Sequence, residues 1–331
     1  MTVSTSSQAN VACPWIRTPL VESKRLSDIA GCRVFLKLEN LQPSGSFKSR
    51  RGIGNLVRYH VQSHPPSTPL HFYSSSGGNA GLACVTAAYD LGYASSVVVP
   101  LSTKPMMIAK IKAAGATQVF QHGATWREAD DYLRTEVLAR DQGGVYVHPF
   151  DDQHVWDGAA TLIPEIQEDL RGQQADVIVC SVGGGGLFTG IAQGLGDDSS
   201  TQIIAVETLG AESLNASIKA RQLVTLPGIT SLATSLGATR VAERPFALAQ
   251  QNNVHSVVVT DAEAVRACLS FADQERMLVE PACGASLAMA YEAKLKDVCA
   301  DLNKDSRVVI VVCGGSNINL DMLAEYKETY A

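Results

Sequence analysis

A lysine that could act as a nucleophile, Lys48, lies in a short polar stretch between a predicted strand and a predicted helix. The stretch, 43–52, follows the alternating segment 33–39 and precedes apolar residues at helical spacing. A cation in the first turn of a helix faces the positive end of the helix dipole, which lowers the pKa of its amine. Arg50 and Arg51 would lower that pKa further if they lie close. The stretch therefore predicts an amine that can attack carbonyls, with an ordinary solvated lysine as the alternative.

Four successive glycines follow a second predicted strand, 176–180, and open a predicted helix: Gly183, Gly184, Gly185 and Gly186. Their backbone N–H groups would lie unshielded at the positive end of that helix, which suits a phosphate group. The register does not match the dinucleotide pattern G-x-G-x-x-G, and no G-K-[ST] follows. Neither a dinucleotide nor a nucleoside triphosphate is therefore indicated. A tight turn with close packing is the structural alternative.

Three further loops follow predicted strands and carry small polar or charged residues. The loop 75–81, Ser-Ser-Gly-Gly-Asn-Ala-Gly, could hold a carboxylate or only cap the next helix. Cys313 is either a neutral thiol partner for a ligand or a small buried apolar residue. Glu207 could hold a cation together with backbone carbonyls, or cap a helix. A phosphate cradle, a carboxylate cradle and a deprotonatable lysine together suit a phosphorylated aldehyde such as pyridoxal phosphate.

Two series of alternating strands and helices position these loops. The predicted strands are 33–39, 71–74, 96–100, 117–121 and 144–148 in the first half, and 176–180, 202–207, 256–260 and 307–312 in the second. Helices predicted near the joins include 21–30, 127–142 and 156–171. Strands and helices in this order with short links predict an α/β fold, with parallel sheets and helices on both faces. Two series predict two lobes, and ligands of such sheets bind beyond the C-terminal ends of the strands.

The composition is that of a globular protein that binds neither nucleic acid nor membrane. The 331 residues carry a net charge of −6, few aromatic residues, no basic stripe and no apolar run of membrane-spanning length. The polar segment 1–10 lacks the apolar core of a secretion signal. The eight cysteines are scattered without a C-x-x-C pair, and no histidine spacing indicates a transition metal. We therefore expect reduced thiols and a cytoplasmic location.

As a set, five motifs resemble those of the fold-type II pyridoxal-phosphate enzymes, and within them the catabolic L-serine/L-threonine dehydratases. In chain order they are Ser44-Gly45-Ser46-Phe47-Lys48, the loop 75–81, and the stretches 182–187, 280–285 and 312–317. The resemblance implies a two-lobed fold with the cofactor in the cleft between the domains. It places a smaller α/β domain, 42–147, as an insertion in a larger domain formed by 1–41 and 148–331. It also implies a homodimer.

The resemblance implies a role for each motif. Lys48 would be the lysine that attaches covalently to pyridoxal phosphate. The other cofactor contacts would be Phe47 beside the ring, Asn79 at its 3′ oxygen, Cys313 at its nitrogen, and Gly183, Gly184, Gly185, Gly186 and Leu187 at the phosphate. The substrate carboxylate would bind Ser76, Gly77, Asn79 and Ala80. A monovalent cation such as K⁺ would lie near Glu207, Ala211 and Leu236.

The implied reaction is a deaminating β-elimination that converts L-serine to pyruvate and ammonia, and L-threonine to 2-oxobutyrate and ammonia. A β-replacement synthase of the cysteine synthase kind, a serine racemase and a non-catalytic binding dimer remain alternatives. The glycine register disfavours a nicotinamide-dependent dehydrogenase. Gly77 stands where the family's substrate loop often has alanine, and the missing methyl group predicts a roomier and looser pocket.

Overall fold

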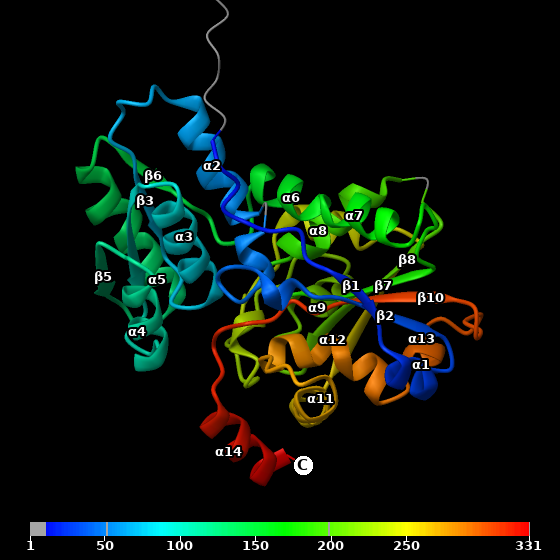
Figure 1. Ribbon diagram of the computed structural model, residues 1–331. Helices are drawn as coiled ribbons and strands as arrows, with labels where there is room; N and C mark the ends of the chain where they lie inside the picture. Colours follow the sequence, from blue (N-terminus) through cyan, green and yellow to red (C-terminus); the bar gives the residue numbers. More distant parts are fainter. Residues whose placement is uncertain (1–10, 51, 198, 331) are drawn as a thin grey trace, which may run out of the picture.

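The computed structural model describes residues 11–50, 52–197 and 199–330. They form two β-sheets that are covered by helices (Figure 1). The predictions made for segment 1–10 and for Arg51 fall outside the described residues. Within the described part of the chain, no helix has both the length and the apolar character needed to cross a membrane.

The larger sheet has six strands in the order β1-β2-β10-β7-β8-β9. Their bounds are β1 Leu20–Glu22, β2 Arg33–Lys37, β7 Val177–Ser181, β8 Gln202–Thr208, β9 Val254–Val259 and β10 Arg307–Val311. Neighbouring strands are parallel, except that β1 is antiparallel to β2. Ile310 in β10 pairs with Leu36 on one side and Val179 on the other. Strand β7 is buried along its whole length, as expected of a parallel strand with helices on both faces.

Helices cover both faces of this sheet (Figure 1). One face carries α6 Gln153–Ala160, α7 Leu162–Asp169 and α8 Gly186–Leu195, and the other carries α1 Lys24–Ala30, α11 Asp261–Glu275, α12 Pro281–Tyr291 and α13 Leu295–Val298. The remaining helices are α9 Ser213–Ala220, α10 Glu243–Leu248 and α14 Leu320–Tyr330. Leu36, Ile191 and Leu287 belong to one hydrophobic core that runs through both faces. Because this core is continuous and closely packed, the larger sheet holds the loops at its strand ends in fixed positions.

The smaller sheet has four parallel strands in the order β5-β4-β3-β6. Its elements are β3 His71–Ser74, β4 Ala94–Val99, β5 Gln118–Gln121 and β6 Gly144–Tyr146, with helices α2 Ile53–Ser63, α3 Asn79–Asp90, α4 Pro105–Ala113 and α5 Trp126–Tyr132. Phe72 packs with α2 and α3 on one face, whereas Tyr73 packs with residues of α5 on the other. Side chains of β3 therefore alternate between two small cores, as the pleat of a strand requires.

The predicted α/β fold with parallel sheets and helices is confirmed, and the differences are local. The short antiparallel strand β1 was not predicted, because three residues are too few for a periodicity signal. The predicted helix 156–171 is two helices, α6 and α7, and the predicted helix 127–142 breaks after α5 into a π turn, Leu133–Val137, and a 3-10 turn, Leu138–Arg140. The domain boundaries at 41/42 and 147/148 stay a prediction.

Candidate active site

Lys48 lies in a single 3-10 turn, η2 (Phe47–Ser49), and not in the first turn of a longer helix. Arg50 ends this turn with φ −52° and ψ 174°. Helix α2 begins only at Ile53. The predicted position of the lysine at a helix start is therefore wrong. A single turn also lacks the aligned peptide dipoles on which the prediction relied.

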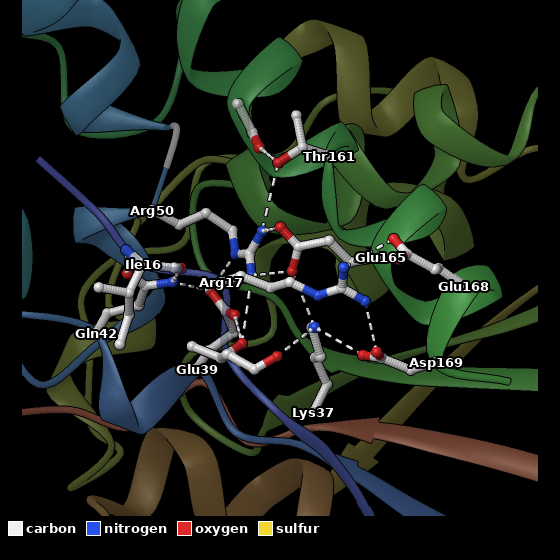
Figure 2. A network of polar contacts seen from close by, with 12 residues as sticks. Ile16, Arg17, Lys37, Glu39, Gln42, Arg50, Thr161, Glu165, Glu168 and Asp169 are labelled. Atoms are coloured by element: carbon white, nitrogen blue, oxygen red, sulfur yellow. Dashed lines mark hydrogen bonds and ion pairs between the residues drawn. The ribbon is translucent and has the colours of Figure 1, made fainter. Parts of the chain in front are cut away.

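The amine of Lys48 is nonetheless easier to deprotonate than that of an ordinary lysine. Burial lowers its pKa to about 8, and the nearby thiol of Cys313 opposes this shift. The Nζ atom donates a hydrogen bond to the carbonyl oxygen of Pro149 at 2.5 Å and lies 5.1 Å from the ring centroid of Phe47. The predicted direction of the pKa shift is confirmed, but its cause is desolvation. Arg50, which was expected to contribute, is neutralised by carboxylates in an ion-pair network (Figure 2).

Backbone hydrogen bonds join the lysine loop to the loop after β10. The N–H of Phe47 donates to the carbonyl oxygen of Cys313 at 3.0 Å, and the N–H of Gly315 donates to that of Gly45 at 2.9 Å. Gly315 has a φ of +125°, which an L side chain rarely adopts. These bonds fix the lysine turn beside the thiol, as the sequence motifs implied when taken together.

Cys313 is buried and its thiol stays protonated. A hydrogen bond with Cys283, followed by burial, raises its pKa well above that of an ordinary thiol, and Glu280 acts in the same direction. All eight cysteines are free, in agreement with the predicted unpaired thiols. The site therefore offers a neutral sulfur group beside the lysine amine.

Asn79 opens helix α3 and is held on both sides of its amide. Its Nδ2 donates to Oε1 of Glu280 at 2.8 Å and to Oγ of Ser235 at 3.3 Å. Its Oδ1 accepts from the N–H of Ser316 at 2.8 Å. Glu280 has a raised pKa because it is buried. Sequence reasoning placed Glu280 in a motif but gave it no role; its signal was a carboxylate directly before a proline at a helix start.

The loop 75–81 is anchored from beneath by Asp130 of α5, a residue that sequence reasoning missed. The buried hydroxyl of Ser75 donates to Oδ1 of Asp130 at 2.6 Å, and the Tyr146 hydroxyl donates to the same atom at 2.5 Å. The hydroxyl of Ser76 accepts from a backbone N–H of its own loop at 3.2 Å. Ala80 lies buried in the first turn of α3. The loop is thus a fixed feature of the smaller sheet.

Gly77 does not leave the roomier pocket that was predicted. A Cβ atom built on Gly77 would lie 2.5 Å from Oγ1 and 2.6 Å from Cγ2 of Thr103. These distances are shorter than van der Waals contact, so Thr103 occupies the space that an alanine methyl would need. The prediction considered the residue type alone and could not foresee a neighbour 26 residues further along the chain.

The glycine loop is closely packed, as the structural alternative predicted, and its role in binding a phosphate stays a prediction. A Cβ atom on Gly184 would lie 2.3 Å from the ring of Phe150, and one on Gly183 would lie 3.0 Å from Cα of Leu236, so close packing requires glycine. Helix α8 begins at Gly186 without a side-chain cap, and Leu187 is buried in its first turn. The first N–H groups of an uncapped helix have no intrahelical partner and suit an anion.

The carboxylate of Glu207, at the end of β8, caps helix α9. Its two oxygens accept from the backbone N–H groups of Leu214 and Asn215, each at 2.8 Å. Burial raises its pKa to about 8. Ala211 is buried in the following turn, and Leu236 lies against the glycine loop. The helix-capping alternative is therefore observed, and the monovalent-cation site stays a prediction.

His148 is a second residue that sequence reasoning missed. Its Nδ1 accepts from the backbone N–H groups of Phe150 at 3.3 Å and Asp151 at 2.7 Å. Burial lowers its pKa to about 4, with the charge of Lys48 contributing in the same direction. The neutral imidazole thus shapes the turn whose Pro149 carbonyl receives the lysine amine. The signal was a histidine at the end of a predicted strand, which one sequence cannot distinguish from an ordinary turn.

These residues fit pyridoxal phosphate. The buried amine suits its aldehyde, the neutral thiol suits its ring nitrogen, and the uncapped start of α8 suits its phosphate. Hydrogen bonds join the lysine loop, the loop after β10 and Asn79 at the start of α3. Among the described residues, no group of three or more His, Cys, Asp or Glu side chains is placed to hold a metal ion.

Comparison with known proteins agrees with this chemistry. Residues 14–314 match the family described as pyridoxal-phosphate dependent enzyme. The chain is 44% identical over 313 residues to the catabolic L-serine/threonine dehydratase of Saccharomyces cerevisiae, covering 89% of this chain and 86% of that one. The structure resembles an L-serine ammonia-lyase from Rhizomucor miehei, with a TM-score of 0.88, 34% identity and coverage of 96% and 99%. It also resembles maize serine racemase, with a TM-score of 0.82, 26% identity and coverage of 97% and 94%. The chain belongs to the family of pyridoxal-phosphate dependent enzymes.

Proposed function

We propose that this protein is an ammonia-lyase that acts on L-serine and L-threonine. The reaction would release pyruvate and ammonia from serine, and 2-oxobutyrate and ammonia from threonine. The names of the yeast relative and of the fungal structure support this proposal. The structural observation that carries it is the buried amine of Lys48, with a pKa lowered to about 8, beside the neutral thiol of Cys313.

The cofactor would be held by residues that the sequence motifs already indicated. They are Lys48 at the aldehyde, Phe47 beside the ring, Asn79 at the 3′ oxygen, Cys313 at the ring nitrogen, and Gly183, Gly184, Gly185, Gly186 and Leu187 at the phosphate. Bound there, pyridoxal phosphate supplies an aldehyde that bonds to amines and a ring that withdraws electrons from the adjacent carbon.

The chain itself would orient the substrate and move its proton. The carboxylate of the substrate would bind Ser76, Gly77, Asn79 and Ala80. The amine of Lys48 has a pKa close to neutral, so it can accept a proton from the substrate α-carbon and release it again. Cys313 is a neutral hydrogen-bond partner for the ring nitrogen, which limits electron withdrawal and favours prompt loss of the β-hydroxyl.

The proposal includes a homodimer, a cytoplasmic location and a monovalent cation such as K⁺ near Glu207, Ala211 and Leu236. The eight free thiols support a reducing compartment. Burial favours the neutral form of Glu207, and among the described residues no ion pair offsets this effect. A cation held with backbone carbonyls would stabilise the ionised carboxylate.

A serine racemase is the second candidate, because the maize enzyme shares the fold at 26% identity. Both reactions begin with removal of the α-proton, and they differ in whether the hydroxyl then leaves. A β-replacement synthase would need a second nucleophile, and a non-catalytic dimer would have no use for the lowered pKa of Lys48.

The test uses purified protein loaded with pyridoxal phosphate and given L-serine without sulfide. We expect pyruvate and ammonia in equal amounts and no accumulation of D-serine. Lys48→Ala should abolish product formation and covalent cofactor attachment, whereas Lys24→Ala, at an exposed lysine, should leave both unchanged. D-serine without pyruvate would favour the racemase, and a wild-type protein that takes up no pyridoxal phosphate would end the proposal.

A further inference from the structure

Arg50 makes five hydrogen bonds, which equals the number of its N–H groups, although its side chain is only 1% exposed. Nε donates to Oε2 of Glu39 at 2.5 Å. Nη1 and Nη2 donate to the two oxygens of Glu165 at 2.9 and 2.8 Å, as Figure 2 shows. Thr161 and Thr18 accept the remaining bonds at 3.4 and 3.2 Å. A guanidinium buried this deeply is stable because each donor has an acceptor in place.

The acceptors of Arg50 are themselves fixed by a buried lysine. Lys37, which is fully buried, donates to Oε2 of Glu165 at 2.9 Å and to the carbonyl oxygen of Thr18 at 2.7 Å, and it lies 3.6 Å from Asp169. Thr18 also donates to Glu39. Lys37 ends β2, and Glu165 lies in α7, so the whole network (Figure 2) is built on the larger sheet. Its two cations are balanced by carboxylates, which makes the arrangement stiff.

The backbone of Arg50 closes the turn that carries Lys48. Its N–H donates to the carbonyl oxygen of Phe47 at 2.9 Å. Ser49 accepts from the N–H of Ser44 at 3.1 Å, and its hydroxyl donates to the hydroxyl of Ser44 at 2.5 Å. The turn is therefore tied to its own loop and, through the side chain of Arg50, to β2 and α7.

Helix α2, which follows this turn, contacts elements of both sheets, and its Asn55 donates to the carbonyl oxygen of His154 in α6. Ile53 and Leu56 of α2 pack in one core with Phe72 of the smaller sheet. We propose that Arg50 is a positioning residue, which fixes the Lys48 turn to the larger sheet independently of the smaller one and so sets where the amine meets the cofactor. This inference rests on the role of Lys48 in the proposed function.

The test separates positioning of the amine from cofactor binding in general. Pyridoxal phosphate can bond to Lys48, whereas pyridoxamine phosphate lacks the aldehyde and binds only through its ring and phosphate. We would measure the rate of covalent attachment of the first to cofactor-free protein, and the affinity for the second. Arg50→Lys keeps the charge but loses the fork that grips Glu165. It should slow attachment by about tenfold or more and change pyridoxamine phosphate affinity by less than about twofold.

Two variants sharpen the result. Glu165→Gln keeps the shape of the acceptor but removes its charge, and it should slow covalent attachment in the same way. If a thermal unfolding scan shows that Arg50→Lys folds poorly, Glu165→Gln is the variant on which the proposal is tested. Arg33→Lys is the matched control, because Arg33 makes an exposed two-pronged pair with Glu22 at 2.9 and 2.8 Å. It should leave both measurements unchanged.

Three outcomes would overturn the inference. The first is an attachment rate that is unchanged in Arg50→Lys. The second is a loss of affinity for pyridoxamine phosphate in Arg50→Lys that is as large as the slowing of attachment. The third is slower attachment in Glu165→Gln but not in Arg50→Lys, which would indicate a charge effect. Failure of the proposed function looks different: the wild-type protein would then not attach pyridoxal phosphate, or would attach it without eliminating serine.

Discussion

Asn79 and Glu280 belong to elements packed on different sheets, and a hydrogen bond of 2.8 Å joins Nδ2 of the amide to the carboxylate. Because the N–H of Ser316 donates to the other end of the amide, Asn79 cannot flip without losing both bonds. Glu280 thereby helps to fix the orientation of the Asn79 amide, with Nδ2 on the side of the carboxylate. It also accepts from the N–H of Asn317 at 3.1 Å.

Replacing Glu280 tests this relationship. Glu280→Gln puts an amide donor where one of two acceptor oxygens stood, so either Asn79 or the backbone of Asn317 loses its partner. We expect a cost of about 1–3 kcal/mol and at least a fivefold weaker affinity for pyridoxal phosphate, measured by absorbance titration. Glu292→Gln, in a surface pair with Arg266, is the control. Equal affinities in the two variants would contradict the role of Glu280.

The lowered pKa of Lys48 predicts how cofactor attachment depends on pH. Only the uncharged amine attacks an aldehyde, and its fraction rises about tenfold per pH unit below the pKa. With a pKa of about 8, the attachment rate of cofactor-free protein should rise up to that pH and then level off. Stopped-flow absorbance between pH 6 and 10 would measure it. A rise that continues to the ordinary lysine value would show that the amine is not desolvated in solution.

The contact between Gly77 and Thr103 predicts a rescue. Gly77→Ala forces a methyl group against the Thr103 side chain and should destabilise the loop by about 1–3 kcal/mol, with a higher KM for serine. Thr103→Ala removes the two atoms that collide, so the double variant should recover most of that loss. Steady-state kinetics on the four proteins would give the coupling. Additive effects in the double variant would mean that the two side chains do not compete for space.

Glu207 makes stability depend on pH. A carboxyl group whose pKa is raised on folding binds more protons in the folded state, so its stabilising contribution is complete below about pH 4.5 and is lost as pH rises through about 8. The wild-type protein should therefore lose stability over this range, by about 1.4 kcal/mol for each pH unit that separates the folded and unfolded pKa values. Glu207→Gln should show a flatter profile. Thermal unfolding from pH 5 to 9 would measure both slopes.

K⁺ extends that experiment to the proposed cation site. If the cation binds the ionised carboxylate, K⁺ should raise Tm at pH 8 in the wild type but not in Glu207→Gln. Sodium at equal ionic strength is the control for general salt effects. The same Tm with either salt would argue against a selective cation at Glu207.

The sequence was informative where chemistry depends on residues close together in the chain. The strands, the glycine run and the lysine loop each carry a local sequence signal. The glycine run and the lysine loop both follow parallel strands of the larger sheet. The 3-10 turn at Lys48 was missed; Arg50 ends this turn, and its side chain is held by Glu165, 115 residues away. A helix signal in the sequence cannot reveal such a distant restraint.

The partners of the predicted residues were equally out of reach. Asn79 and Glu280 are 201 residues apart, and Lys48 and Pro149 are 101 apart. Asp130 and His148 act by accepting hydrogen bonds inside the fold, which gives them the same appearance in the sequence as any polar residue near a turn. Burial likewise determines the pKa of Lys48, and burial is a property of the packed structure.

All four strands of the smaller sheet lie between β2 and β7 in the chain. The segment that leads into the smaller sheet and the segment that leads out of it meet where the amine of Lys48 donates to the carbonyl oxygen of Pro149. The glycine loop and Cys313 stand outside this insert, whereas the loop 75–81 and Thr103 stand inside it. Lys48 and Asn79 also lie between β2 and β7, so exchange of this segment between relatives would carry the proposed substrate contacts together with part of the proposed cofactor contacts. For protein engineers, an exchanged segment that begins after Arg50 would keep Lys48 and its proposed anchor in the recipient chain.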